Sequence, residues 1–311
     1  MSHDNHQHNH SHGHDHGHHT TSNKKVLFFS FLLITFFMVV EAVGGFLTNS
    51  LALISDAGHM LSDAAALGLS LLAFKIGERQ ATYSKTYGYR RVEIIAAFIN
   101  GLTLIIISLY IFYEAFQRFI EPPNVSASMM IIAFIGLVVN IVVAWMLMRG
   151  DSQENLNIRS ALLHVLGDLL GSIGAIVAGI LILLFGWDIA DPIASVIVAI
   201  LIVISGIRVT KDSIHILMEG KPTNINVEEV KSKLMELPGI DDVHDFHIWS
   251  ITSEFPALSC HLVVDNTVDR DKILIQANKL LKKHFSISHS TLQIEGINLH
   301  IKNDCNDCSP S

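Results

Sequence analysis

Two short segments of the chain each place a histidine and an aspartate four residues apart: HMLSD at residues 59–63 and HVLGD at residues 164–168. Both lie in strongly apolar surroundings, and they hold the only two histidines between residues 26 and 207. Because residues four apart share one face of an α-helix, each pair directs an imidazole and a carboxylate to the same side. A lone aspartate at the middle of a membrane costs roughly 2.5–3.5 kcal/mol, so each pair needs a partner or a bound cation. We therefore predict that the two pairs face each other.

The facing pairs would form one metal site from two imidazoles and two carboxylates, namely His59, Asp63, His164 and Asp168. This donor set suits tetrahedral Zn²⁺ and also Co²⁺ or Cd²⁺, whereas Mg²⁺ and Ca²⁺ prefer oxygen alone. Metal binding needs neutral histidine and ionised aspartate, so protons compete with the cation at the same atoms. The site therefore predicts exchange of a divalent metal for protons across a membrane.

Other interpretations of these polar residues stay open. In one alternative, each His–Asp pair forms a hydrogen bond within or between helices that stabilises their packing. Asp56, one turn before His59, is either an accessory ligand and proton acceptor or a helix-packing group. An intramembrane metallohydrolase would need three ligands, a water and a general base, as in HExxH, and no such motif occurs in the sequence. Four protein ligands leave no position for an activated water, so we predict a carrier and not an enzyme.

The elements that must hold these pairs are membrane spans, since half of the 311 residues are hydrophobic and only 16% are charged. Runs long enough to cross about 30 Å of hydrocarbon occur at 26–47, 51–75, 92–117, 127–148, 160–185 and 189–207. Lysine and arginine gather on the side of the N-terminus, which places both termini in the cytoplasm. Small residues at every fourth position of the fifth run predict close packing of that helix; they are Gly167, Gly171, Ala175 and Gly179.

Polar segments flank the transmembrane transport domain, which we place at 25–208. Residues 1–24 carry nine histidines and form a disordered cytoplasmic tail, which either collects divalent metal near a pore mouth or is a solvated tail or purification tag. Residues 209–300 show helix, strand, strand, helix and strand patterns, the αββαβ order of a small ferredoxin-like α+β domain. Residues 301–311 form a tail with CNDC, which in a reducing compartment indicates metal or redox chemistry. With a net charge of −8 and no basic stripe, no nucleic-acid partner is expected.

Together these motifs resemble a known family. The segments SDAGHMLSD and HVLGD, the loop YGYRRVE at 87–93, the His-rich N-terminus and VHDFHIWSIT after the spans are similar to the cation diffusion facilitator family, and most similar to its bacterial cobalt-zinc-cadmium efflux branch. The resemblance covers residues 25 to 300. It implies a homodimeric Zn²⁺/H⁺ antiporter of the bacterial plasma membrane, in which Zn²⁺ is both the substrate and a regulatory ligand.

The resemblance also implies a second metal site, in the cytoplasmic domain. By their positions in the family's motifs, His244, His261 and Glu295 would be its ligands, joined by Cys305 and Cys308 of the terminal C-x-x-C. An ordinary strand surface remains the alternative for His244 and His261. The domain would then both dimerise and bind metal.

Two further features follow from the same resemblance. Arg91 and Glu219 match a charge interlock between the membrane and cytoplasmic parts, and Asn278 stands where relatives with a fuller site have a second histidine, which predicts one metal per cytoplasmic domain. Two rival functions stay open. A Mn²⁺ or Fe²⁺ exporter would favour more oxygen ligands, and a membrane metal sensor would keep the ligands but carry no flux.

Overall fold

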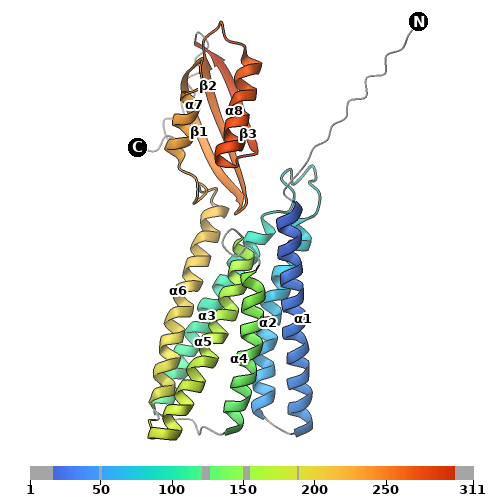
Figure 1. Cartoon of the computed structure of the whole chain (residues 1–311), viewed down its shortest axis with the longest axis vertical. Helices are drawn as coiled ribbons and strands as arrows, with labels where there is room; N and C mark the ends of the chain where they lie inside the picture. Colours follow the sequence, from blue (N-terminus) through green and yellow to red (C-terminus); the bar gives the residue numbers. More distant parts are fainter. Residues whose placement is uncertain (1–16, 49–50, 121–126, 150–154, 188, 298–311) are drawn as a thin grey trace, which may run out of the picture.

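The computed structural model describes residues 17–48, 51–120, 127–149, 155–187 and 189–297, apart from some side chains within these ranges. Six long helices run side by side in one bundle, and a smaller α+β domain lies beyond one end of it (Figure 1). The helices are α1 Gly17–Thr48, α2 Leu51–Gly77, α3 Val92–Ile120, α4 Ala127–Met148, α5 Leu156–Phe185 and α6 Ala190–Leu217. All six predicted spans are therefore helical. Within the described residues, α3, α5 and α6 are long and apolar enough to cross a membrane.

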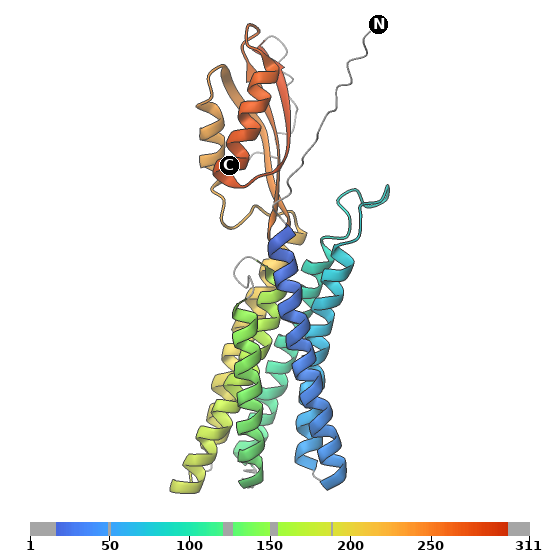
Figure 2. The ribbon, with the colours of Figure 1, turned by 45° about the vertical axis from the view of Figure 1, so that its right-hand side comes forward.

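Three helices of the bundle, α1, α5 and α6, are several residues longer than the sequence predicts, and α1 begins at Gly17, so residues 17–24 are helical and not part of a disordered tail as predicted. α5 begins at Leu156 because the side chain of Asn155 caps it, accepting hydrogen bonds from the backbone N–H groups of Asn157 and the next residue. It ends at Gly186, whose φ of 63° is a left-handed conformation that glycine adopts without steric cost. α6 continues to Leu217, past the predicted end at 207, and leads into the C-terminal domain (Figure 2).

The closest described helix contact joins α3 and α6, and it depends on two glycines. A Cβ on Gly206 would lie 3.0 Å from the carbonyl oxygen of Gly101, and a Cβ on Gly101 would lie 2.6 Å from Thr210 Oγ1. Around Gly171 of α5, by contrast, a Cβ would meet none of the described atoms within 4 Å. The predicted close packing is therefore found at Gly167, where a Cβ would lie 3.2 Å from the side chain of Ile202 of α6, but not at Gly171, because which helix turns approach each other depends on tertiary structure that a spacing pattern does not encode.

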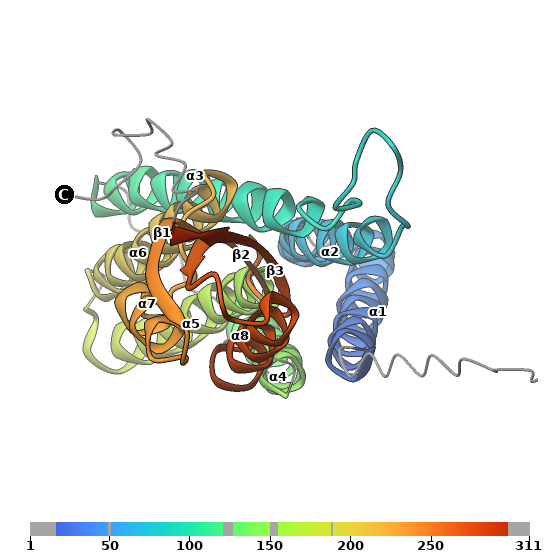
Figure 3. The ribbon, with the colours of Figure 1, turned by 90° about the horizontal axis from the view of Figure 1, so that it is seen from above.

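The C-terminal domain has the predicted αββαβ order. Its elements are α7 Val227–Met235, β1 Ile240–Thr252, β2 Phe255–Val264, α8 Arg270–Phe285 and β3 His289–Gly296. Strand β2 lies in the centre of the sheet, antiparallel to β1 and parallel to β3, since a crossover through α8 joins the two parallel strands. Viewed along the bundle, this domain lies over α5 and α6 and leaves α1 and α2 uncovered (Figure 3).

The two helices of this domain cover only one face of its sheet. Leu258 and Leu262 of β2 point to this face and pack against Leu234 of α7 and Ile273 of α8 in a buried apolar core. Because side chains alternate along a strand, His261 points to the opposite face. The predicted ligands of the C-terminal domain therefore lie away from its core helices.

Candidate metal sites

Asp63 of α2 meets His164 and Asp168 of α5 inside the bundle. One ligand atom of each residue lies within 4.8 Å of those of the other two. His164 Nε2 is 2.9 Å from Asp63 Oδ1, and the two residues are 4% and 6% exposed. Residues separated by 101 positions in the chain are thus brought into direct contact, as the paired motifs predict.

The donor chemistry of this cluster fits a divalent cation. Asp168 Oδ2 is buried and has no hydrogen-bond partner among the described residues. A buried carboxylate oxygen without a partner is costly unless a cation or a proton satisfies it. Ala64 and Val165, which follow Asp63 and His164 in the chain, belong to a buried apolar cluster, and such a dry environment strengthens every charge interaction. One imidazole and two carboxylates are ligands that Zn²⁺ accepts.

The fourth predicted ligand, His59, lies in α2 one helical turn before Asp63, on the same face of the helix. Its side chain and that of Asp56 lie outside the described residues. The structure therefore brings together three of the four predicted ligands and leaves undescribed the side chains of the fourth, His59, and of the possible accessory residue Asp56.

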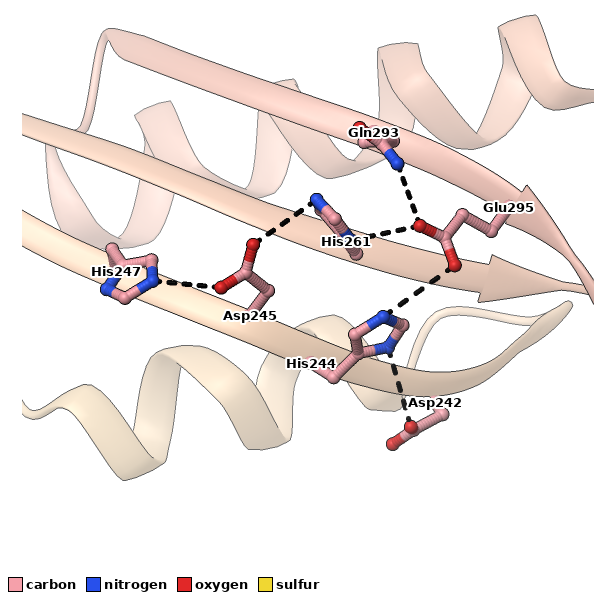
Figure 4. A network of polar contacts seen from close by, with 7 residues as sticks. All are labelled: Asp242, His244, Asp245, His247, His261, Gln293 and Glu295. Carbon is pink, nitrogen blue, oxygen red and sulfur yellow. Dashed lines mark hydrogen bonds and ion pairs between the residues drawn. The ribbon is translucent and has the colours of Figure 1, made fainter. Parts of the chain in front are cut away.

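A second cluster of metal-ligand type lies on the open face of the C-terminal sheet (Figure 4). Its ligand atoms, from His244, His261 and Glu295, lie within 4.8 Å of one another. Strand register explains this meeting: His244 of β1 pairs directly with His261 of β2, and Glu295 of β3 pairs with Val263, two residues farther along β2. Two residues along a strand restore the same face, so all three side chains point to one side.

Glu295 is the centre of this second cluster. It is 3% exposed, with Oε1 at 2.9 Å from His261 Nδ1 and Oε2 at 3.7 Å from His244 Nε2. Gln293 donates a hydrogen bond of 2.8 Å to Oε1 and so fixes the carboxylate (Figure 4). A buried carboxylate between two imidazoles is a donor set suited to Zn²⁺.

Asp245 and His247, which lie beside this cluster, were not predicted from the sequence. A β-bulge lies between His244 and His247, and Asp245 within it has a φ of 47°. The Asp245 carboxylate lies 3.4 Å from His261 Nε2 and 3.0 Å from His247 Nε2 (Figure 4). Regular alternation would place Asp245 on the face opposite to His244, so only the bulge brings it here. In the sequence, only the close spacing of His and Asp in VHDFH pointed to Asp245 as a neighbour of the site, and this spacing does not predict a β-bulge.

Cys260, next to His261, is not part of either cluster. It is 1% exposed and lies in the apolar core under the helices. Burial, with a smaller contribution from Asp245, raises the pKa of its thiol to about 12. Cys260 therefore stays a neutral thiol, which is a poor metal ligand. Cys305 and Cys308, the predicted additional ligands, lie outside the described residues.

Comparisons with known proteins decide the family. The family profile described as the cation efflux transmembrane domain matches residues 27–218, and the profile of the cation efflux protein cytoplasmic domain matches residues 222–297. The chain belongs to the cation efflux family. It is therefore an integral membrane cation transporter, and its C-terminal domain is the cytoplasmic domain of that family.

Curated relatives cover nearly the whole chain. The cadmium, cobalt and zinc/H⁺-K⁺ antiporter of Bacillus subtilis is 55% identical over 282 residues, which is 89% of this chain and 91% of the relative. The zinc transporter ZitB of Escherichia coli is 43% identical over 276 residues, 88% of each chain. The metal cation efflux system protein CzcD of Cupriavidus metallidurans is 38% identical over 279 residues, 89% of this chain and 88% of the relative.

Contacts between the two domains of this cation efflux protein are made by charged and polar groups. Arg91, in the turn before α3, lies 3.2 Å from Glu219, which follows α6, so the pair predicted as a charge interlock does meet. Asn155, the cap of α5, donates a hydrogen bond of 2.9 Å to Glu254 at the tip of the β1–β2 hairpin. The backbone N–H of Leu156 also lies 3.4 Å from Ser253 Oγ. The hairpin thus rests on the start of the helix that carries His164 and Asp168.

Asn278, which stands where relatives have a second histidine, lies apart from the metal cluster of the cytoplasmic domain. Its side chain donates to the carbonyl oxygen of Leu274 and accepts a hydrogen bond from Ser290. The bond with Ser290 joins α8 to β3, whereas the bond with Leu274 lies within α8, and both leave Asn278 with a structural role.

Proposed function

We propose that this protein exports Zn²⁺ from the cytoplasm in exchange for protons, with Cd²⁺ and Co²⁺ as further substrates. The observation that carries the proposal is the buried cluster of Asp63, His164 and Asp168, in which the buried Oδ2 of Asp168 has no hydrogen-bond partner among the described residues. His59 completes the set as the fourth ligand, and Asp56 serves as an accessory group one turn away. The printed names of the relatives, which include zinc, cadmium and cobalt, support this choice of substrates.

Proton exchange follows from the hydrogen bond between His164 and Asp63. The two residues share a proton across 2.9 Å, and a metal ion can take both ligands only when that proton leaves. In the inward-facing state the site gives up protons and takes Zn²⁺ from the cytoplasm. In the outward-facing state protons rebind and displace the metal, so the two ions move in opposite directions through one site.

We infer that the cytoplasmic cluster is a regulatory Zn²⁺ site within a homodimer. His244, His261 and Glu295 hold the metal, and Cys305 and Cys308 add thiolates from the terminal segment. The protein lies in the bacterial plasma membrane with both termini in the cytoplasm, in accord with its lysine and arginine distribution. The Arg91–Glu219 pair and the contact between Glu254 and Asn155 join this domain to the bundle.

We further propose K⁺ as a second counter-ion. The relative from Bacillus subtilis is named a zinc/H⁺-K⁺ antiporter and is 55% identical to this chain. Exchange of a divalent cation for one proton moves net charge, and a second monovalent cation reduces that imbalance.

The test of the proposed function is Zn²⁺ flux in proteoliposomes that contain a trapped zinc dye, driven by a pH jump. Flux in the native protein should follow the proton gradient and should fall to background in Asp63→Ala and Asp168→Ala, because each change removes a ligand. The matched control is Ser108→Ala, a buried residue of α3 whose hydroxyl bonds a carbonyl of its own helix. Flux that survives in either aspartate variant, or that ignores the pH gradient, would refute the proposal.

A further inference from the structure

Four buried polar residues form a second cluster inside the bundle, between the metal site and the cytoplasmic end. They are Ser70 of α2, Asn100 of α3, and Asn157 and Ser160 of α5, each at most 3% exposed. Asn100 Nδ2 donates to Ser70 Oγ at 3.2 Å and to Ser160 Oγ at 3.4 Å. Asn157 Nδ2 donates to the backbone oxygen of Ser70 at 3.0 Å, and Ser160 Oγ donates to the backbone oxygen of Asn157 at 2.8 Å. We call these residues the amide–hydroxyl cluster.

The amide–hydroxyl cluster lies on the same helix faces as the metal ligands. Ser70 follows Asp63 by seven residues, and Asn157 precedes His164 by seven, which is two helical turns or about 10 Å in each case. Ser160 precedes His164 by four residues, about 6 Å. A cation that moves between the metal site and the cytoplasm along the α2–α5 contact therefore passes this cluster.

One oxygen atom in the cluster lacks a partner. Asn157 is only 1% exposed, and its Oδ1 atom is buried without a hydrogen-bond partner within the described part of the chain. Its amide nitrogen is engaged with Ser70, so the oxygen is held inside the same cluster. Buried acceptors are rarely left unsatisfied, and each exception calls for a bound ion, a water or a function.

The cluster offers only neutral oxygens, and this decides which ion it suits. The oxygens of the cluster belong to amide, hydroxyl and backbone groups, and none of the four residues carries a charge. Such oxygens replace the hydration shell of K⁺ in potassium-selective sites. Zn²⁺ instead requires imidazole, thiolate or carboxylate, and a divalent charge among neutral groups pays a far larger desolvation cost.

Negative charge is available at the mouth without entering the cluster. Asn155 caps the helix that carries Asn157 and donates to Glu254 at the tip of the β1–β2 hairpin. The carboxylate of Glu254 attracts cations to the end of the bundle and offsets the positive N-terminus of α5. The neutral oxygens of the cluster therefore favour weak binding of a monovalent cation, and the carboxylate at the cytoplasmic end of the bundle attracts that cation from solution.

We propose that the amide–hydroxyl cluster is the K⁺ site of this transporter, with Asn157 Oδ1 as a direct ligand. This inference rests on the proposed function, because it assigns a place to the counter-ion of metal export. The cluster stays separate from the Asp63, His164 and Asp168 site, so K⁺ and protons act at different atoms. Substitution of the cluster residues should therefore abolish the stimulation of Zn²⁺ flux by K⁺, whereas the exchange of Zn²⁺ for protons should continue.

The experiment measures Zn²⁺ flux in proteoliposomes at a fixed pH gradient with K⁺, Rb⁺, Na⁺ or a bulky organic cation as the monovalent ion. Native flux should rise with K⁺ and with Rb⁺, and less with Na⁺. In Asn157→Ala the K⁺ concentration for half-maximal stimulation should rise about tenfold or more, the equivalent of one lost ligand. The control Ser108→Ala should keep the native K⁺ dependence.

A second variant keeps the proposal testable if Asn157→Ala fails to fold. Ser160→Ala removes one hydroxyl oxygen of the cluster and leaves Asn157 in place, so binding of radioactive Rb⁺ to the purified protein should become weaker. Unchanged Rb⁺ binding in this variant, or native K⁺ dependence in Asn157→Ala, would mean that the cluster only packs the helices and would overturn the proposal. Native Zn²⁺ flux that follows protons but ignores K⁺ would overturn the K⁺ site alone, whereas absence of proton-driven flux would overturn the proposed function.

Discussion

Single residues decide the chemistry of the cytoplasmic metal site, and Glu295 is the residue whose substitution should affect metal binding most. Its carboxylate is buried and contacts both imidazoles. We expect Glu295→Gln to lower the number of Zn²⁺ ions bound per full-length chain by one, because a neutral amide is a poor Zn²⁺ ligand. Equilibrium dialysis with Zn²⁺ measures this number. His284→Ala, an exposed histidine in the last turn of α8, should bind the native amount, and an equal loss in both variants would contradict the assignment.

At the same scale, the sequence predicts the membrane site better than its surroundings. The four-residue spacing in HMLSD and HVLGD is enough to bring Asp63 and His164 into contact, because helical periodicity fixes which side chains share a face. No comparable rule predicts that Asp245 reaches His261, since a bulge and a positive φ place it there. Nor does any spacing rule reveal the amide–hydroxyl cluster, whose members come from three helices.

Among the elements, the contact of α3 with α6 sets the tightest packing requirement. We expect Gly206→Ala to lower the stability of the folded bundle by about 1–3 kcal/mol, as overpacking does, because its Cβ would lie 3.0 Å from a backbone oxygen of α3. Thermal unfolding in detergent should show a lower Tm. Gly171→Ala is the matched control: a Cβ there meets none of the described atoms within 4 Å, and alanine is the better helix former. A Tm that falls equally in both variants would rule out the packing explanation.

The existence and order of the elements were predictable, whereas their partners were not. Long apolar runs and strand alternation identify all six membrane helices and the αββαβ order, because local burial and periodicity carry that information. The end of α6 at Leu217 was missed, since its last turns leave the apolar region and continue toward the cytoplasmic domain. The small-residue pattern on α5 predicted close packing that occurs at Gly167 and not at Gly171, because glycine spacing shows where a close approach is possible and not where a neighbouring helix makes it.

For the whole molecule, the question is how the cytoplasmic domain acts on a transport site deep in the bundle. The β1–β2 hairpin joins them: His261 near its base belongs to the metal cluster, and Glu254 at its tip bonds the cap of α5. The two residues are seven positions apart, which corresponds to roughly 23 Å along a strand. The exposed Arg91–Glu219 pair contributes under about 1 kcal/mol as a surface ion pair, so the hairpin contact is the better candidate for transmitting a change at the metal cluster.

This hairpin contact makes the last prediction. In Glu254→Ala, Zn²⁺ bound at the cytoplasmic cluster should no longer alter the transport rate, because Asn155 loses the hydrogen bond that ties α5 to the hairpin. The number of Zn²⁺ ions bound should stay at the native value, since Glu254 is far from His261 along the strand. Flux in proteoliposomes, measured with and without Zn²⁺ on the cytoplasmic face before the pH jump, reports the effect. Glu254→Gln should restore native behaviour, because its amide oxygen still accepts from Asn155 Nδ2. If the glutamine variant instead matches Glu254→Ala, the charge of Glu254 is what matters, and the hydrogen bond does not connect the two domains.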